Sequence, residues 1–292
     1  MPLMKQITQK VPSVAPLFLA LGILGCGNGD SGGGSEQNAQ GATDEDAADS
    51  ESSGSGSKAN SRRSRTPDAE RIGTEDYESE QSGALYGEIR TKKGDVERFP
   101  IGARQKSECK HHADVEHLSD VLLVKNGRIQ NAFVYIKSGY DKDGIPPAPS
   151  SSVTLDQKGC LYTPHVLALR TGQELRVANS DPTNHNVNII SRRNEGGNRN
   201  MGRGQAPVAY SFPRPEVGIR FKCDIHPWMG ARVHVSEHPW FAITDAAGKF
   251  RIPDVPPGKY IVEVVHEDLG KTRGTVTVEA GKASGFTLSL DG

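Results

Sequence analysis

The segment 221–229 (FKCDIHPWM) places three metal-binding side chains at intervals of three residues. Cys223, His226 and Met229 offer a thiolate, an imidazole and a thioether. Soft sulfur ligands favour reduced copper and imidazole serves both oxidation states, so this set suits an ion that cycles between Cu(II) and Cu(I). A fourth ligand must come from elsewhere, and His185 in the stretch NSDPTNHNV follows directly after a strand-like run.

Two strands are expected to position these ligands. Before His185, the residues Leu175, Val177 and Asn179 alternate along one face. In the run VGIRFKC, alternation predicts that Val217, Ile219, Phe221 and Cys223 point inward, because successive side chains of a strand face opposite sides of a sheet. The thiolate would then be buried and protected from solvent.

The rest of the chain after residue 83 is also typical of β-structure. Short runs rich in Val, Ile, Phe and Tyr alternate with Gly, Pro and Asp punctuation, as at 132–136 (AFVYI) and 259–266 (KYIVEVVH). One short helix is expected at 111–120. Many short strands at regular spacing predict an all-β fold built as two β-sandwiches.

Cysteine usage separates the thiols into different roles. Exported chains meet an oxidising compartment, where paired cysteines become disulfides. With Cys26 set apart as an N-terminal lipid site and Cys223 assigned to a metal, Cys109 and Cys160 are left to pair. The alternative is two free buried thiols. The neighbouring histidines His111, His112 and His117 could hold a second metal with Cys109, but their spacing fits no mechanism, which favours a surface loop.

The N-terminal part indicates export and a tether. A basic start is followed by an apolar run that ends in ILGC at Cys26, and the segment 27–82 carries thirteen acidic and five basic side chains, with Ile72 and Tyr77 as its large apolar or aromatic residues. Such a segment cannot form a core. The ending resembles the bacterial lipobox, which implies a signal peptide at 1–25, lipidation of Cys26 and a disordered acidic tether at 26–82. An ordinary cleaved signal is the alternative.

Residues 153–235 closely resemble the cupredoxins, the plastocyanin and amicyanin group of blue copper proteins. The resemblance is carried by Tyr162-Thr163-Pro164, Gly172, Asn179, the triplet His185-Asn186-Val187 and the Cys-His-Met loop. It implies a Greek-key β-sandwich over 148–236 with one type-1 copper. His185, Cys223 and His226 would be the equatorial ligands and Met229 the weak axial one. Asn186 would tie the two ligand loops together, and electrons would pass through His226. Zinc, or loss of the metal, is the alternative.

Residues 241–290 resemble the smaller carboxypeptidase regulatory-like or starch-binding-like β-sandwich. The pattern consists of a turn at Asp245–Gly248, a Pro256-Pro257-Gly258 turn and a following alternating strand. Because 237–292 is short for such a domain, we expect its first strands at 83–147, with the cupredoxin inserted between. The competing layout assigns 84–140 to the cupredoxin and separates Tyr86 and Ile89 from the C-terminal strands.

These observations predict an extracytoplasmic blue copper protein that carries single electrons between redox partner proteins. The chain would not be an enzyme, because no nucleophile stands with a defensible base and acid. A net charge of +5 over 83–292 is too weak to indicate nucleic acid. The expected location is the outer membrane, cell surface or periplasm, with membrane contact through the lipid alone. The alternatives are a copper carrier or sensor and a metal-free surface adhesin. Tyr140 and Trp240 as exposed aromatics leave glycan binding possible.

Overall fold

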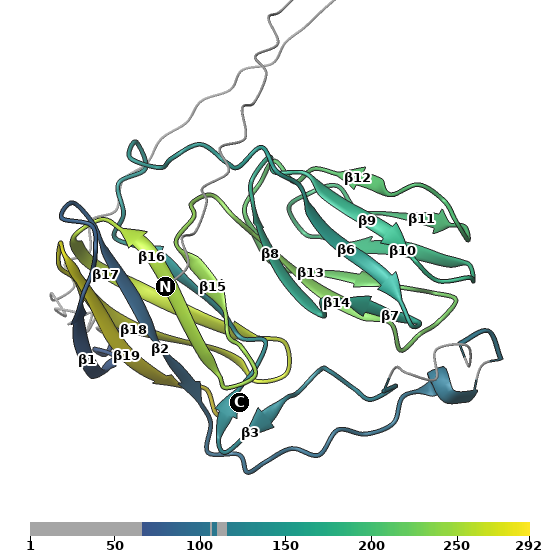
Figure 1. Cartoon of the computed structure of the whole chain (residues 1–292), viewed down its shortest axis with the longest axis horizontal. Helices are drawn as coiled ribbons and strands as arrows, with labels where there is room; N and C mark the ends of the chain where they lie inside the picture. Colours follow the sequence, from purple (N-terminus) through teal and green to yellow (C-terminus); the bar gives the residue numbers. More distant parts are fainter. Residues whose placement is uncertain (1–65, 106, 110–115) are drawn as a thin grey trace, which may run out of the picture. The chain divides into compact units, whose positions relative to one another are not determined.

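The computed structural model describes residues 66–105, 107–109 and 116–292, which belong to one compact unit of the chain. In these residues the secondary structure consists of β-strands and two short 3-10 segments, η1 (Gly102–Gln105) and η2 (Ser107–Cys109). The predicted all-β fold is confirmed (Figure 1). None of the described helical segments is long and apolar enough to cross a bilayer. The predicted helix at 111–120 lies partly outside the described residues, and residues 116–120 are not helical.

The first sandwich contains nine strands in two sheets. One sheet has the order β11-β10-β13-β14-β8, with β8 parallel to β14, and the other has the order β12-β9-β6-β7, with β6 parallel to β9. The strands are β6 (Val153–Lys158), β7 (Leu161–Thr163), β8 (Val166–Arg170), β9 (Leu175–Asn179), β10 (His185–Ile190), β11 (Gly197–Met201), β12 (Val208–Tyr210), β13 (Glu216–Lys222) and β14 (Gly230–Ser236).

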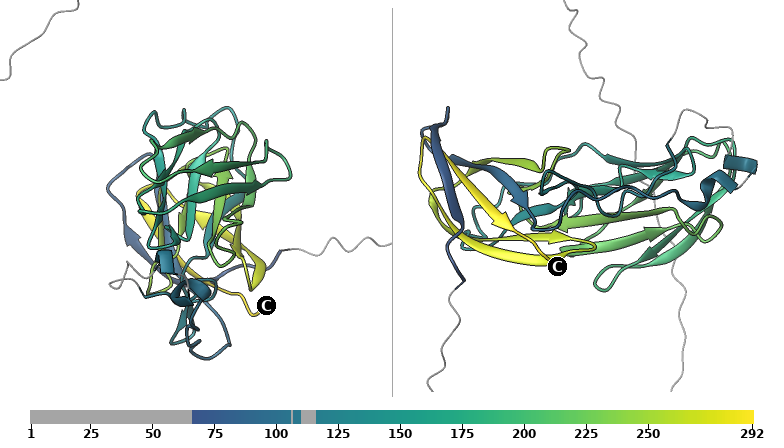
Figure 2. Two further views of the ribbon diagram at one scale, coloured as in Figure 1. Left: turned by 90° about the vertical axis from the view of Figure 1, so that its right-hand side faces the viewer. Right: turned by 90° about the horizontal axis from the view of Figure 1, so that it is seen from below.

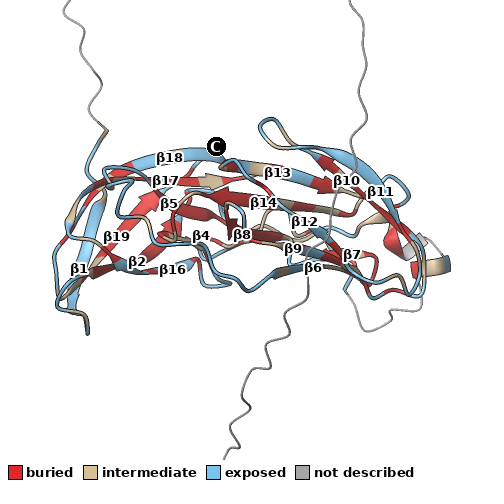
Figure 3. Cartoon of the chain, turned by 90° about the horizontal axis from the view of Figure 1, so that it is seen from above, coloured by how far each residue is buried: buried red, intermediate tan, exposed pale blue. Residues whose placement is uncertain are grey.

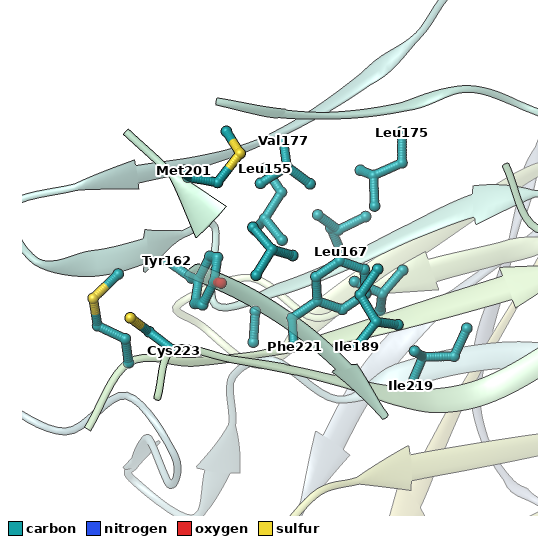
Figure 4. Close-up of a cluster of buried hydrophobic side chains, with 14 of the residues drawn as sticks. Leu155, Tyr162, Leu167, Leu175, Val177, Ile189, Met201, Ile219, Phe221 and Cys223 are labelled. Carbon is teal, nitrogen blue, oxygen red and sulfur yellow. The ribbon is translucent and has the colours of Figure 1, made fainter. Parts of the chain in front are cut away.

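The core of the first sandwich lies between the inner faces of its sheets. Ile219 and Phe221 of β13 point into it, together with Leu155, Leu175 and Val177 of the opposite sheet. Figure 3 shows the buried residues along these strands, and Figure 4 shows the cluster itself, with Cys223 at one end. Cys223 is thus attached to a packed apolar core.

The predicted inward orientation of Val217 is wrong. Its side chain is 38% exposed. The pairing of β13 with β14 shifts register between Glu216 and Ile219, and Gly218 has a φ of 79°. A bulge at this position turns Val217 outward while Ile219, Phe221 and Cys223 keep their inward orientation. The alternation that buries Cys223 therefore begins after the bulge.

The second sandwich is built from strands that are far apart in the sequence. One sheet has the order β1-β19-β2-β4-β3, with β16 also paired to β2, and the other has the order β15-β5-β17-β18. The dark-blue strands β1 and β2 lie beside the yellow strand β19 (Figures 1 and 2). The strands are β1 (Glu70–Asp76), β2 (Gly83–Arg90), β3 (Val124–Lys125), β4 (Arg128–Ile129), β5 (Phe133–Ser138), β15 (Phe241–Ile243), β16 (Lys249–Val255), β17 (Gly258–His266), β18 (Gly270–Val278) and β19 (Lys282–Ser289).

The pairing of β2 and β5 bears on how the chain is divided. β2, which contains Tyr86 and Ile89, pairs with β19 and β16, and β5 pairs with β17 and β15. These are the pairings that an inserted first sandwich requires. We therefore propose that 83–147 and 237–292 build one domain around the sandwich at 148–236.

Two parts of the expected layout need correction. Residues 70–76, inside the predicted tether, form the edge strand β1, which pairs antiparallel with β19. β1 is held by main-chain pairing with β19 and does not depend on burying apolar side chains, since Ile72 is 48% exposed. In the region assigned to the second sandwich, Ala103 and Cys109 instead pack into the core of the first. The signal segment, Cys26 and the start of the tether lie outside the described residues.

Candidate metal centre

Two paired strands and one loop bring the candidate ligands together. His185 is the first residue of β10, and Cys223 directly follows β13, which pairs with β10. In the loop before β14, the N–H of Met229 donates to the His226 carbonyl (2.9 Å) and the N–H of Cys223 donates to the Met229 carbonyl (3.2 Å). The loop is closed by its own backbone, which holds the motif at one end of the sheet.

The ligand atoms of His185, Cys223 and His226 form a compact triangle. The Nδ1 atoms of the two imidazoles are 2.9 Å apart, and the Sγ of Cys223 is 3.9 Å from each of them. A point equidistant from the three atoms lies about 2.1 Å from each, and metal–nitrogen and metal–sulfur bonds in proteins are about 2.0–2.3 Å long. The residues present therefore fit one transition-metal ion.

The site is buried, and its donors are of the type that copper takes. His185, Cys223, His226 and Met229 all lie in the interior. Two imidazoles and one thiolate with a weak methionine are the donor set of blue-copper sites. Met229 belongs to the same core cluster as Cys223. The other buried methionine, Met201, pairs with His185 across β10 and β11, and its sulfur accepts a contact from Gln205 Nε2 at 3.8 Å.

Electrostatics prepare the thiol for binding. Burial raises the pKa of Cys223, but hydrogen bonding to His185 and to the backbone outweighs burial and holds this pKa below its ordinary value. Burial likewise lowers the pKa of His185, but Asp181 and Cys223 outweigh burial and leave it above its ordinary value. The lowered pKa makes Cys223 easier to deprotonate than an ordinary cysteine, and a metal requires a deprotonated cysteine.

Asn186 ties the two ligand segments together. Its Oδ1 accepts from the backbone N–H of Asp224 (2.7 Å) and of Ile225 (3.3 Å), and lies 3.2 Å from the Sγ of Cys223. Its Nδ2 donates to Asn198 (2.6 Å) and to the Asp224 carboxylate (3.0 Å). One buried amide on β10 therefore fixes the start of the Cys-His-Met loop, which is the role that the sequence resemblance implies for it.

A buried carboxylate contacts the other side of His185. The Nε2 of His185 lies 2.8 Å from Asp181 Oδ2, and both side chains are fully buried. The same carboxylate accepts from the backbone N–H of Gly159 (2.6 Å) and of Cys160 (2.8 Å). His185 is therefore held on one side by the candidate metal position and on the other by Asp181.

A segment from outside the nine-stranded sandwich covers His226. His226 is 0% exposed. Its Nε2 lies 3.5 Å from Glu108 Oε1 on η2, and its ring centroid lies 5.2 Å from that of Trp228. Cys109, next to Glu108, forms a disulfide with Cys160 across a sequence separation of 51 residues. The disulfide thus fastens η2 to the turn beside the candidate ligands, and the ring of His226 is closed off from the surface.

The other candidate clusters hold no second site in the described residues. The remaining groups of three potential ligands are Cys109, Cys160 and His226, and Cys160, Asp181 and His185, and both include sulfurs of the disulfide. The Nε2 of His117 is bonded to the carbonyl of Gly159 at 2.9 Å. His111 and His112 lie outside the described residues.

The prediction that Trp240 is an exposed aromatic is wrong. Trp240 is buried, and its Nε1 donates to the Asp254 carbonyl at 2.9 Å. Its neighbour Tyr140 is partly buried and donates its hydroxyl hydrogen to Glu237. An indole inside the core cannot stack on a sugar ring, so the glycan prediction loses this residue.

Sequence reasoning brought His185, Cys223, His226 and Asn186 to one site, but it missed Asp181 and Glu108. Asp181 lies four residues before His185, and a single Asp in a polar loop carries no signal that distinguishes it from a surface residue. Glu108 lies far from the ligands in sequence and reaches His226 because the neighbouring Cys109 is bonded to Cys160. The pair of cysteines was therefore the one signal that pointed towards this contact.

Comparisons with known proteins give a domain match and several structural likenesses. The family model of the carboxypeptidase regulatory-like domain matches residues 225–291. A search of curated proteins finds no relative of the sequence. Similar solved structures include the copper-containing nitrite reductase NirK from Thermus scotoductus SA-01, at 21% identity and a TM-score of 0.29, covering 32% of this chain and 27% of that chain.

Two small proteins are among the other similar structures. A purple cupredoxin from Nitrosopumilus maritimus has 21% identity and a TM-score of 0.25 over 30% of this chain and 99% of that chain. A mutant of amicyanin in its Cu(I) form has 18% identity and a TM-score of 0.27 over 35% and 98%. At TM-scores this low, the three structural likenesses carry no argument about function. Residues 225–291 are thus similar to the carboxypeptidase regulatory-like domain, and the nine-stranded sandwich carries a buried His-Cys-His cluster.

Proposed function

We propose that this protein would hold one copper ion at His185, Cys223 and His226, with Met229 as a further weak ligand, and carries single electrons between redox partner proteins. The observation that carries the proposal is the triangle of two Nδ1 atoms and one Sγ, 2.9, 3.9 and 3.9 Å on its sides. Bound copper would supply a one-electron change between Cu(II) and Cu(I).

The protein's own residues would keep the site alike in both oxidation states. Asn186 holds the start of the ligand loop, and the loop's backbone hydrogen bonds hold Cys223 and Met229. Asp181 holds His185. A scaffold with fixed ligands would lower the reorganisation energy of each electron transfer, because the charge of the ion changes within a polar environment that is already organised.

Burial of the ligands limits how an electron reaches a partner. His226 lies beneath Glu108 and beside Trp228, which is partly exposed. We therefore propose that a partner docks over Trp228 and the η2 segment, with His226 as the last protein ligand on the route.

Copper reconstitution tests the proposal. Cu(II) added to the disulfide-bonded apoprotein should give an intense visible absorption from the thiolate, at one ion per chain, and the colour should be lost in Cys223→Ser. Reversible one-electron voltammetry would support electron transfer. A protein that stays colourless with Cu(II) but binds Zn(II) tightly would favour a structural zinc site. Rapid copper exchange without reversible redox chemistry would favour a copper carrier.

We also propose that the chain is exported and held at a membrane by a lipid on Cys26. The ILGC ending supports this, as does the Cys109–Cys160 disulfide, because disulfides persist in oxidising compartments. Cys26→Ser should move the protein from the membrane fraction to the soluble fraction. An unchanged distribution between fractions would contradict the anchor.

A further inference from the structure

The starting point is a carboxylate that the sequence did not single out. Asp181 lies two residues after β9 and is buried with its whole side chain. Its oxygens lie within hydrogen-bond distance of Gly159 N, Cys160 N and His185 Nε2, at 2.6, 2.8 and 2.8 Å. A buried carboxylate needs such donors, because an ionised group out of water is costly unless it is paired and hydrogen-bonded.

The turn between β6 and β7 is shaped to hold this carboxylate. Lys158 pairs with Leu161, so Gly159 and Cys160 form a two-residue hairpin turn, and both have positive φ, 68° and 54°. Successive backbone N–H groups in a turn can form an anion-binding concavity. Here both N–H groups point at Asp181. The position of the carboxylate is therefore fixed by main-chain donors that do not depend on a metal.

The carboxylate in turn determines how His185 presents its ring. An acceptor at Nε2 keeps the proton on that nitrogen and leaves the Nδ1 lone pair directed at the candidate metal. The outward nitrogen of His226 is in a different position, because it faces Glu108 at 3.5 Å and the Glu108 side chain is 38% exposed. The two imidazoles thus differ in charge environment although both offer Nδ1 to the site.

We propose that Asp181 is a positioning residue that strengthens His185 as a donor and makes the site bind Cu(II) more tightly relative to Cu(I). This inference rests on the proposed copper function. A buried negative charge one imidazole away from the metal stabilises the more highly charged ion, because the interior screens charge less than water does. Asp181 therefore lowers the reduction potential of the site.

The test compares Asp181→Asn with a matched control, Asp156→Asn. The asparagine oxygen can still accept from Cys160 and His185, whereas its Nδ2 would face the Gly159 N–H, so Asp181→Asn removes the charge and one backbone hydrogen bond. Asp156 is a half-buried aspartate on β6 whose Oδ2 accepts from Ser180 at 2.7 Å, and it contacts none of the ligands. Both variants lose one unit of formal charge in the same sheet region.

The measurements are competition titrations with chelators of Cu(II) and of Cu(I), and voltammetry of each variant. In Asp181→Asn we expect Cu(II) affinity to fall roughly 10- to 100-fold, with a much smaller loss for Cu(I). Each tenfold fall in the ratio of Cu(II) affinity to Cu(I) affinity raises the reduction potential by about 59 mV. Asp156→Asn should change the ratio less than about twofold. An equal loss for both ions, or equal shifts in both variants, would overturn the inference and leave the copper site standing.

A second measurement does not depend on the variant folding. In the Cu(I)-loaded wild type, ¹⁵N-edited NMR should show an Nε2 proton on His185 that is shifted farther downfield and exchanges more slowly than the Nε2 proton of His226. Equal shifts and exchange rates for the two protons would overturn the inference. A wild-type protein that takes up no copper would instead overturn the proposed function, and this inference with it.

Discussion

The Asn186 amide offers the sharpest test of how the ligand loop is held. In Asn186→Ala the backbone N–H groups of Asp224 and Ile225 lose their shared acceptor, and the Nδ2 bonds to Asn198 and Asp224 are also lost. The perturbation therefore acts at the first two residues after Cys223, where the loop begins.

The magnitude follows from the donors left without a partner. A buried donor without an acceptor costs about 1–3 kcal/mol. Asp224 and Ile225 have exposed side chains, which allows water to reach part of the loop, so a combined loss of about 2–3 kcal/mol is expected. For a folded unit of this size, each kcal/mol lost from the free energy of unfolding lowers Tm by about 2–4 °C. The predicted fall in Tm is therefore roughly 4–12 °C.

Thermal and urea unfolding of the metal-free protein measure this effect without copper. Asn188→Ala is the matched control, because it lies on the same strand and donates its Nδ2 to Asp224 at 2.9 Å without touching the loop backbone. A loss below about 0.5 kcal/mol is expected there, as for other surface substitutions. If Asn186→Ala and Asn188→Ala unfold within 1 °C of each other, the amide does not hold the loop and the reasoning is refuted.

Three further predictions concern the disulfide, the buried histidines and the axial ligand. Replacing Cys109 and Cys160 by serine should lower the free energy of unfolding by about 4 kcal/mol for a loop of 51 residues, checked by denaturant titration beside non-reducing peptide mapping of the wild type. Burial lowers the pKa of His234 to about 3 and of His238 to about 4, so the unfolded chain binds more protons below pH 6.5. Stability should therefore be full above pH 6.5 and fall towards pH 4 by up to about 1.4 kcal/mol per pH unit for each histidine. His234→Phe should reduce this slope, and a flat profile from pH 7 to 5 would count against neutral burial. Met229→Leu should retain copper and raise the reduction potential, which voltammetry can contradict.

The sequence alone determined the features that depend on local spacing. Alternation along β9 and β13 gave the strands, and three-residue intervals in the Cys-His-Met loop gave a set of donors, because side-chain period and ligand spacing are properties of a short stretch of chain. The presence of His185 after a strand was also readable. The all-β class followed from the same repeated pattern.

The tertiary structure decided what distant segments do to those donors. The bulge at Gly218 turned Val217 outward, and edge pairing with β19 ordered residues 70–76, which lack the apolar side chains that a sequence pattern detects. The contact between Asp181 and His185 exists because a hairpin turn 21 or more residues earlier directs two N–H groups at the carboxylate. Hydrogen bonds between distant segments depend on how the strands pair and the sheets stack, and no local sequence pattern encodes that pairing. The position of the Asp181 carboxylate beside His185 could therefore be found only in the folded chain.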